Sequence, residues 1–213
     1  MKELTSKNNL NQFKLAPCIF QCIIKQNYHQ KVINFSIKKL TLFYSIYKLG
    51  VNPTTLRNTN TSLYLGSCYN DTAVAKIEDC SHGTPSLDLG PMEVSRTFGF
   101  TGATILLDTA CASSFSALHE ACQALKMGIT ERVVVGGIAL HLRPNLAQGF
   151  RNLRMLSLDG TCKCLDARAD GYCRSEAVVS MFVQRRKEAK RVYATLVHSK
   201  TNADGFKTEG IFK

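Results

Sequence analysis

The sequence predicts an α/β fold, and three consecutive segments carry that prediction. Residues 103–107 are apolar and partly β-branched, which is typical of a buried strand. From Phe115 to Leu125 apolar residues recur at helical spacing, and Gly128 stands where a helix should end. Residues 132–135 again form a short apolar run. A strand, a helix and a further strand in succession indicate a sheet with helices packed on it.

The segments before this unit begin with a predicted turn over residues 52–57, which Pro53 is suited to start. Residues 61–68 are predicted to form a buried strand. Residues 76–92 are rich in Gly, Pro, Ser and Asp, which indicates a loop.

Four predicted segments follow the second strand of that unit. We expect a long irregular loop, a strand that crosses the core, a charged and solvated link, and the opening of a last strand. These predictions cover residues 140–160, 172–183, 185–191 and 192–197, respectively.

Cys111 lies in a turn of small residues, 108–114, between the first strand and the helix. The unpaired N–H groups and the positive end of the dipole at a helix N-terminus both favour a thiolate. Asp108 and Thr109 are expected to shape the turn and cap the helix. The placement suits a covalent nucleophile. The alternative is a buried structural cysteine, because free cysteines are among the residues most often buried.

Charge and composition narrow the classes of function. The formal net charge is +11, and residues 1–50 account for +7 of it. The rest of the chain is therefore only mildly basic, and we expect no nucleic-acid or membrane partner. Nine cysteines without a secretory cleavage site fit a reducing compartment, and we expect a cytoplasmic protein. The close pairs Cys18/Cys22 and Cys162/Cys164 lack a second pair at zinc-like spacing, so we expect no metal.

Residues 1–48 form a predicted divergent segment without an assignment. Lys, Asn, Ile, Phe and Tyr, which A/T-rich codons encode, supply 26 of the first 50 residues. We therefore expect a gene-model artefact over 1–48 and one partial domain over 49–213. A membrane or nucleic-acid binder that uses residues 1–50 is the weakest alternative, since it rests on charge alone.

The stretch Asp-Thr-Ala-Cys-Ala-Ser-Ser at 108–114 closely resembles the active-site segment of β-ketoacyl synthases, the condensing domains of fatty acid and polyketide synthases. The resemblance covers residues 49–210. The segments Gly-Tyr-Cys-Arg-Ser-Glu at 171–176 and Asn-Ala-Asp-Gly-Phe-Lys at 202–207 are most like animal type I fatty acid synthase. Further motifs follow in family order at residues 50–57, 62–66, 117–125, 133–137, 143–145, 155–163 and 191–195.

This resemblance implies a thiolase-like layered αβαβα fold, of which the chain holds the N-terminal half, truncated at both ends. It implies Cys111 as the catalytic residue of a decarboxylative condensation. The acyl and malonyl substrates would arrive on the phosphopantetheine of an acyl carrier protein, no cofactor would be bound directly, and the intact enzyme would be a homodimer. The family helix that lines the dimer interface and acyl tunnel has no recognisable counterpart at residues 90–94.

The histidines of the chain are expected to be structural. His119 follows Cys111 by eight residues on one helix, about 12 Å along the axis, which is too far for a nucleophile–base pair. The family's two catalytic histidines stand in later motifs that do not occur in these 213 residues, so we expect acylation of Cys111 without turnover. Two alternatives stay open: a polyketide ketosynthase, and a non-catalytic fragment that binds acyl chains or partner subunits.

Overall fold

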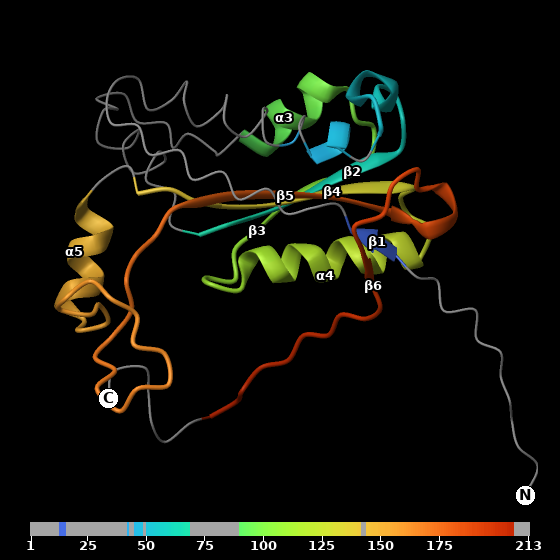
Figure 1. Cartoon of the computed structure of the whole chain (residues 1–213). Helices are drawn as coiled ribbons and strands as arrows, with labels where there is room; N and C mark the ends of the chain where they lie inside the picture. Colours follow the sequence, from blue (N-terminus) through green and yellow to red (C-terminus); the bar gives the residue numbers. More distant parts are fainter. Residues whose placement is uncertain are drawn as a thin grey trace, which may run out of the picture.

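The computed structural model is built on a six-stranded mixed sheet with the strand order β3-β2-β4-β5-β1-β6 (Figure 1). In its parallel half, β2 (Thr61–Ser67) lies between β3 (Thr104–Leu107) and β4 (Arg132–Ala139). These strands confirm the three predicted from apolar runs. The structure describes residues 13–15, 42, 45–48, 50–68, 90–141 and 144–206.

The other half of the sheet is antiparallel. β5 (Ala177–Arg185) pairs with every residue of β4. β1 (Phe13–Leu15) lies between β5 and β6 (Ala194–Leu196) and pairs antiparallel with both. The predicted charged link before β6 contains the short 3-10 helix η2 (Arg186–Glu188), none of whose residues is buried.

Helices cover both faces of the sheet (Figure 1). α4 (Ser113–Lys126) lies along one face, and it ends before Gly128, whose φ of 74° suits a helix stop. α3 (Gly90–Phe98) and the 3-10 helix η1 (Pro53–Leu56) lie on the other face. α5 (Pro144–Asn152) stands beyond the end of β4. The layers are therefore helix, sheet and helix.

Alternation along the strands divides the core into two clusters. Val133 and Val135 of β4 pack with Leu125 of α4, whereas Val134 packs on the opposite face with Phe182 of β5. Side chains of successive strand residues point to opposite faces, which explains the division. Leu42 and Ile46, which belong to the segment predicted to be divergent, are buried in the second cluster: Leu42, Ile46, Leu56, Leu63, Leu65, Val94, Phe100, Val134 and Phe182.

The structure corrects three predictions. β3 is an edge strand of the described sheet, so Ile105 and Leu106 are 38% and 43% exposed instead of buried. Residues 140–160 contain α5, and residues 90–94 begin α3. The amphipathic pattern in α4 also includes one exposed member, Phe115.

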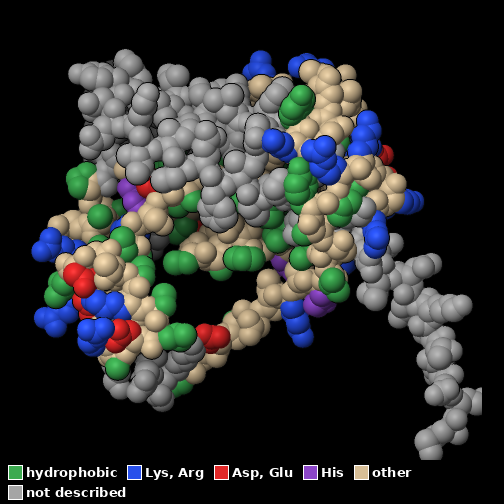
Figure 2. Space-filling view, in the orientation of Figure 1, with side chains coloured by type: hydrophobic (Ala, Val, Ile, Leu, Met, Phe, Trp, Pro, Cys, Tyr) green, Lys and Arg blue, Asp and Glu red, His purple; other side chains and the backbone are tan. Residues whose placement is uncertain are grey.

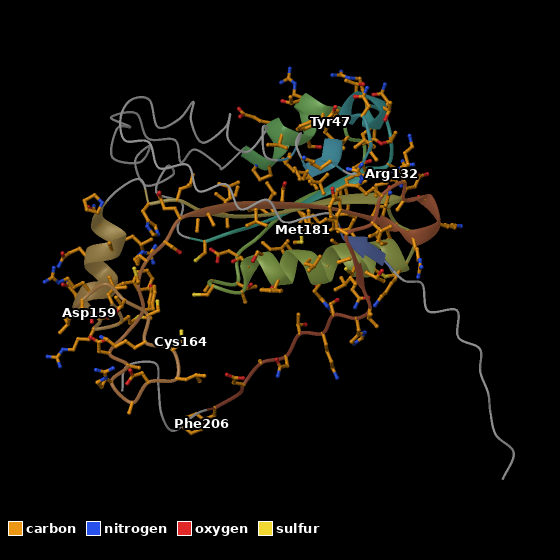
Figure 3. The ribbon with its side chains drawn as sticks, viewed as in Figure 1. Tyr47, Arg132, Asp159, Cys164, Met181 and Phe206 are labelled. Atoms are coloured by element: carbon orange, nitrogen blue, oxygen red, sulfur yellow. The ribbon has the colours of Figure 1, made fainter. Side chains whose placement is uncertain are left out.

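The chain leaves the sheet after β6 as an extended segment that reaches Phe206, which is 93% exposed (Figure 3). Met181 of β5, in contrast, packs against the cluster beneath α4. Figure 2 shows an opening between the extended segment and the main body of the molecule.

Candidate functional site

The turn before α4 has an unusual backbone at Ala110. Its φ of 52° lies in the left-handed region, which non-glycine residues rarely adopt. The Asp108 carboxylate accepts the Ala110 N–H at 3.0 Å and so holds this conformation. The N–H groups of Ala112 and Ser113 donate to the carbonyls of Thr109 and Ala110 at 3.2 and 3.1 Å. Cys111 therefore stands in a backbone fixed by hydrogen bonds on both sides.

Hydroxyl groups add a second set of bonds to the turn. The Ser113 hydroxyl donates to the Ala110 carbonyl at 2.6 Å and accepts the Thr109 N–H at 3.0 Å. The hydroxyls of Thr109 and Ser116 lie 2.8 Å apart. The predicted turn-shaping role of Asp108 and Thr109 is thus confirmed. Their predicted capping role is wrong, because Ala112 holds the cap position without a side-chain bond.

Two glycines let the N-terminus of α4 approach the sheet closely. A Cβ at Gly66 of β2 would overlap the Ser113 carbonyl and the Ser114 nitrogen. A Cβ at Gly137 of β4 would lie 2.7 Å from the Ser114 Cβ. The sequence reasoning missed this function of Gly66, although a glycine inside a strand is a known signal of close backbone approach.

Cys111 is exposed in this structure, whereas the alternative interpretation has it buried. A second thiol, Cys68, lies near it just beyond β2 and is half-buried. Burial raises the pKa of the Cys68 thiol to about 11, and the negative charge and hydrogen bond of Asp108 act in the same direction. Cys68 therefore remains a neutral thiol at physiological pH.

The other predicted polar residues have structural contacts. His119 Nδ1 lies 3.1 Å from the Ser199 hydroxyl, which confirms that this histidine is hydrogen-bonded within the fold. Glu176 accepts the backbone N–H of His141.

Groups of metal-ligating side chains and membrane-spanning helices are both absent from the described residues. No group of three or more His, Cys, Asp or Glu side chains there could hold a metal ion. No helix in the same ranges is both long and apolar enough to cross a bilayer. A small apolar cavity lies on the sheet face opposite α4, and Cys111 is not among its lining residues, which include Leu42, Leu65 and Ile138.

The fold and the turn together define a layered α/β domain that presents a cysteine between a parallel strand and a helix N-terminus. The family model for the N-terminal domain of β-ketoacyl synthases matches residues 42–189. The chain belongs to the β-ketoacyl synthase family.

Comparisons with individual proteins agree with the family. The chain is 40% identical over 168 residues to a fatty acid synthase of Anser anser anser, a match that covers 76% of this chain and 48% of that protein. It is 36% identical over 165 residues to the erythronolide synthase EryA2 of Saccharopolyspora erythraea, covering 73% of this chain and 5% of that protein. The chain thus spans about half or less of the length of these relatives.

A solved structure confirms the fold class. The ketosynthase from module 6 of the bacillaene synthase of Bacillus subtilis 168 superposes with a TM-score of 0.73 at 26% identity. The match covers 82% of this chain and 31% of the ketosynthase chain. The chain therefore has the thiolase-like α/β fold predicted from its motifs, and corresponds to part of that fold.

Proposed function

We propose that Cys111 is the acyl-accepting nucleophile of a β-ketoacyl synthase that extends acyl chains in fatty acid synthesis. One observation carries the proposal: an exposed thiol stands at the N-terminus of α4, on a turn with a left-handed residue held by Asp108. A helix N-terminus stabilises negative charge, on a thiolate or on an oxyanion formed beside it.

In the proposed first step, the Cys111 thiolate attacks the carbonyl carbon of an acyl thioester carried on the phosphopantetheine of a carrier protein. A carbon–sulfur bond forms to Cys111, the bond to the carrier sulfur breaks, and the carrier leaves as a thiol after taking up a proton. The Cys111 N–H is the proposed donor to the oxyanion formed in between. Malonyl-carrier protein would then lose carbon dioxide, and its carbanion would displace Cys111 as the new carbon–carbon bond forms.

Fatty acid synthesis is favoured over polyketide synthesis by sequence identity. The identity is 40% to the goose fatty acid synthase and 30–36% to several polyketide synthases. A polyketide ketosynthase is the second candidate because matches to two such relatives are of similar length, 176 and 165 residues against 168 residues for the fatty acid synthase.

Dimer formation and location are further parts of the proposal. Ile105 and Leu106 are exposed on the β3 edge, and an exposed apolar edge strand is suited to pair with a second copy of the chain.

The six described cysteines are all unpaired, which fits a reducing, cytoplasmic location. The division of the chain at residue 48 stays a prediction; the family match begins at residue 42.

The test is acylation of the purified chain by a straight-chain acyl N-acetylcysteamine thioester, followed by intact-mass and peptide mass spectrometry. We expect one acyl group, on Cys111, and its loss in Cys111→Ser. Cys164→Ser is the matched control, since Cys164 is also an exposed cysteine but lies far along the chain from the turn. Equal acylation of the exposed cysteines, or full acylation of Cys111→Ser, would contradict the proposal.

A further inference from the structure

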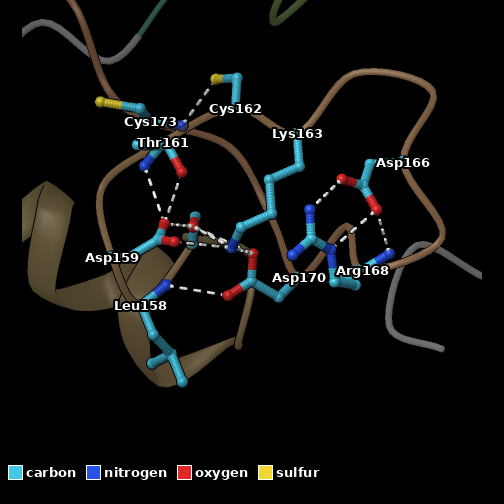
Figure 4. A network of polar contacts seen from close by, with 10 residues as sticks. Leu158, Asp159, Thr161, Cys162, Lys163, Asp166, Arg168, Asp170 and Cys173 are labelled. Atoms are coloured by element: carbon cyan, nitrogen blue, oxygen red, sulfur yellow. Dashed lines mark hydrogen bonds and ion pairs between the residues drawn. The ribbon is translucent and has the colours of Figure 1, made fainter.

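The loop of residues 153–174 brings two cysteines into direct contact. The backbone N–H of Cys173 donates to the Cys162 sulfur at 3.1 Å (Figure 4). Both side chains are exposed, as is Cys164, the third cysteine of this loop. The acyl-transfer chemistry proposed for Cys111 uses none of the three.

Bonds on both sides of the cysteine pair hold the two chain segments together. Next to Cys173, the Tyr172 N–H donates to the Met155 carbonyl at 3.1 Å, and the Tyr172 carbonyl accepts the Ser157 N–H at 3.0 Å. Next to Cys162, the Lys163 ammonium bonds Asp170 at 2.6 Å. The contact between the cysteines is therefore fixed by its surroundings.

Asp159 completes this arrangement on the Cys162 side. Its carboxylate binds the Lys163 ammonium at 3.0 Å and accepts the Thr161 hydroxyl at 2.7 Å (Figure 4). Lys163 thus joins a carboxylate from each arm of the loop. Cys164 lies just beyond Lys163 and is not one of the residues joined in this network.

We propose that Cys162 and Cys173 are a thiol-modification site that closes to a disulfide. The nitrogen of Cys173 is only two bonds from its own Cβ, so the Cys162 sulfur lies within reach of a disulfide bond to Cys173. The Cys173 thiol at present donates to the Arg174 carbonyl at 3.6 Å, so closure requires rotation about its Cα–Cβ bond. Because both thiols are exposed, an oxidant can reach them.

The oxidant class is a low-molecular-weight disulfide such as oxidised glutathione. One cysteine thiolate attacks it, forms a mixed disulfide and releases one reduced thiol. The second cysteine then attacks the mixed disulfide and releases the second reduced thiol. Two electrons and two protons pass from the cysteine pair to the oxidant, and thiol reductants reverse the reaction.

The cross-link would stabilise a segment that contacts the rest of the domain through Arg174, the neighbour of Cys173. The Arg174 guanidinium lies 2.7 Å from His141 Nε2 and 4.9 Å from the centre of the Phe150 ring. A closed Cys162–Cys173 bond therefore restrains the loop at the point where it meets the end of β4 and α5.

The chain itself supplies a sharp test, because cleavage after Arg154, Lys163, Arg168 and Arg174 places the three cysteines in separate peptides. The folded protein would be treated with oxidised glutathione, its remaining thiols alkylated, and the denatured protein digested with trypsin without reduction. We expect peptide 155–163 to be joined to peptide 169–174 in the wild type and in Cys164→Ser. The linked peptide should be lost in Cys162→Ser and in samples reduced before alkylation.

If proximity in the sequence alone decided the pairing, Cys162 would link to Cys164, since the two are separated by a single residue. Predominant linkage of Cys164 to either partner, or glutathione adducts that never resolve into an internal bond, would overturn the proposal. Acylation of Cys111 is measured in portions of the same proteins that have met neither the oxidant nor the alkylating reagent, because both reagents would modify the exposed Cys111 thiol. Failure of that acylation would contradict the proposed function and leave the linkage proposal standing, because the Cys162–Cys173 bond does not require Cys111.

Discussion

The turn that carries Cys111 and the loop of residues 153–174 both present exposed cysteines, yet different forces hold them. The turn leads into α4, whose inner face is buried against β2 and β4, with Leu125 fully buried. The loop has fewer apolar anchors: Leu158 is 89% exposed and Leu165 is fully exposed, although the Tyr172 ring packs edge-on against Phe150. Its shape depends mainly on polar contacts, which are the Lys163 ion pairs with Asp159 and Asp170 and the backbone hydrogen bonds of Tyr172.

Because different forces hold the two regions, their structures should respond to different substitutions and solution conditions. Hydrophobic packing depends on the volume and shape of buried side chains and responds little to salt or mild acid. An exposed ion-pair network depends on the charge of its members and is screened by salt. The position of Cys111 should therefore respond to core substitutions, whereas the Cys162–Cys173 contact should respond to changes of charge.

The largest expected effect is a loss of stability when the core beneath α4 is opened. Leu125→Ala should lower the free energy of unfolding by about 2–5 kcal/mol, because it removes buried methyl groups and leaves a cavity. Leu165→Ala makes the same chemical change in the loop, where the side chain is fully exposed, and should alter stability by less than about 0.5 kcal/mol. Urea denaturation of both variants measures the difference; equal losses would contradict the comparison.

A smaller effect should follow from adding one methyl group where α4 meets the sheet. Gly66→Ala places a Cβ against the Ser113 carbonyl, so overpacking should cost about 1–3 kcal/mol and shift the turn that carries Cys111. Acylation of Cys111 should therefore slow. Gly149→Ala is the matched control: its Cβ meets no atom within 4 Å, and alanine should stabilise α5 by about 0.5–1 kcal/mol. Unchanged acylation in Gly66→Ala would show that the close contact is not required.

The sequence predicted the packed part of the molecule much better than the polar part. The apolar runs that became β2, β3 and β4, and the periodic residues of α4, report burial directly, and burial drives these elements to form. An apolar run does not reveal a strand's place in a sheet, which is why exposure of Ile105 at the β3 edge was unexpected. α5 was missed because the helix is only nine residues long and its apolar residues, Leu146, Ala147 and Phe150, are few and only partly buried.

The residues of the candidate site also differ in how well the sequence alone predicts them. Cys111 was found from a strand, a turn and a helix that are adjacent in sequence. The support from Gly66 and the contact between Cys162 and Cys173 depend on residues brought together by the fold. Local spacing cannot show such contacts, because they depend on the register of distant segments.

The smallest effect concerns the ionisation of the loop carboxylates. The Lys163 ammonium is the main cause of a lowered pKa at Asp170, whereas the Thr161 hydroxyl is the main cause at Asp159, where Lys163 contributes less. The pKa of Asp166 is lowered by Arg168 instead. Lys163→Gln should therefore raise the pKa of Asp170 most, that of Asp159 less, and that of Asp166 not at all. Arg168→Gln should raise the pKa of Asp166 alone.

Carboxyl ¹³C chemical shifts followed from pH 6 down into strong acid would measure all three groups in one sample. Because the folded pKa values are lowered, the ion pairs stabilise the loop above the ordinary aspartate pKa of about 3.9, and this stabilisation is lost as the pH falls through the folded values. In Asp170→Asn, which removes the same ion pair and keeps tryptic cleavage after Lys163, the Cys162–Cys173 linkage should become less dominant over linkage to Cys164, since one of the bonds that hold the two arms together is gone. If Asp170 titrates unchanged in Lys163→Gln, the ion pair does not hold the loop, and the backbone hydrogen bonds of Tyr172 must do so.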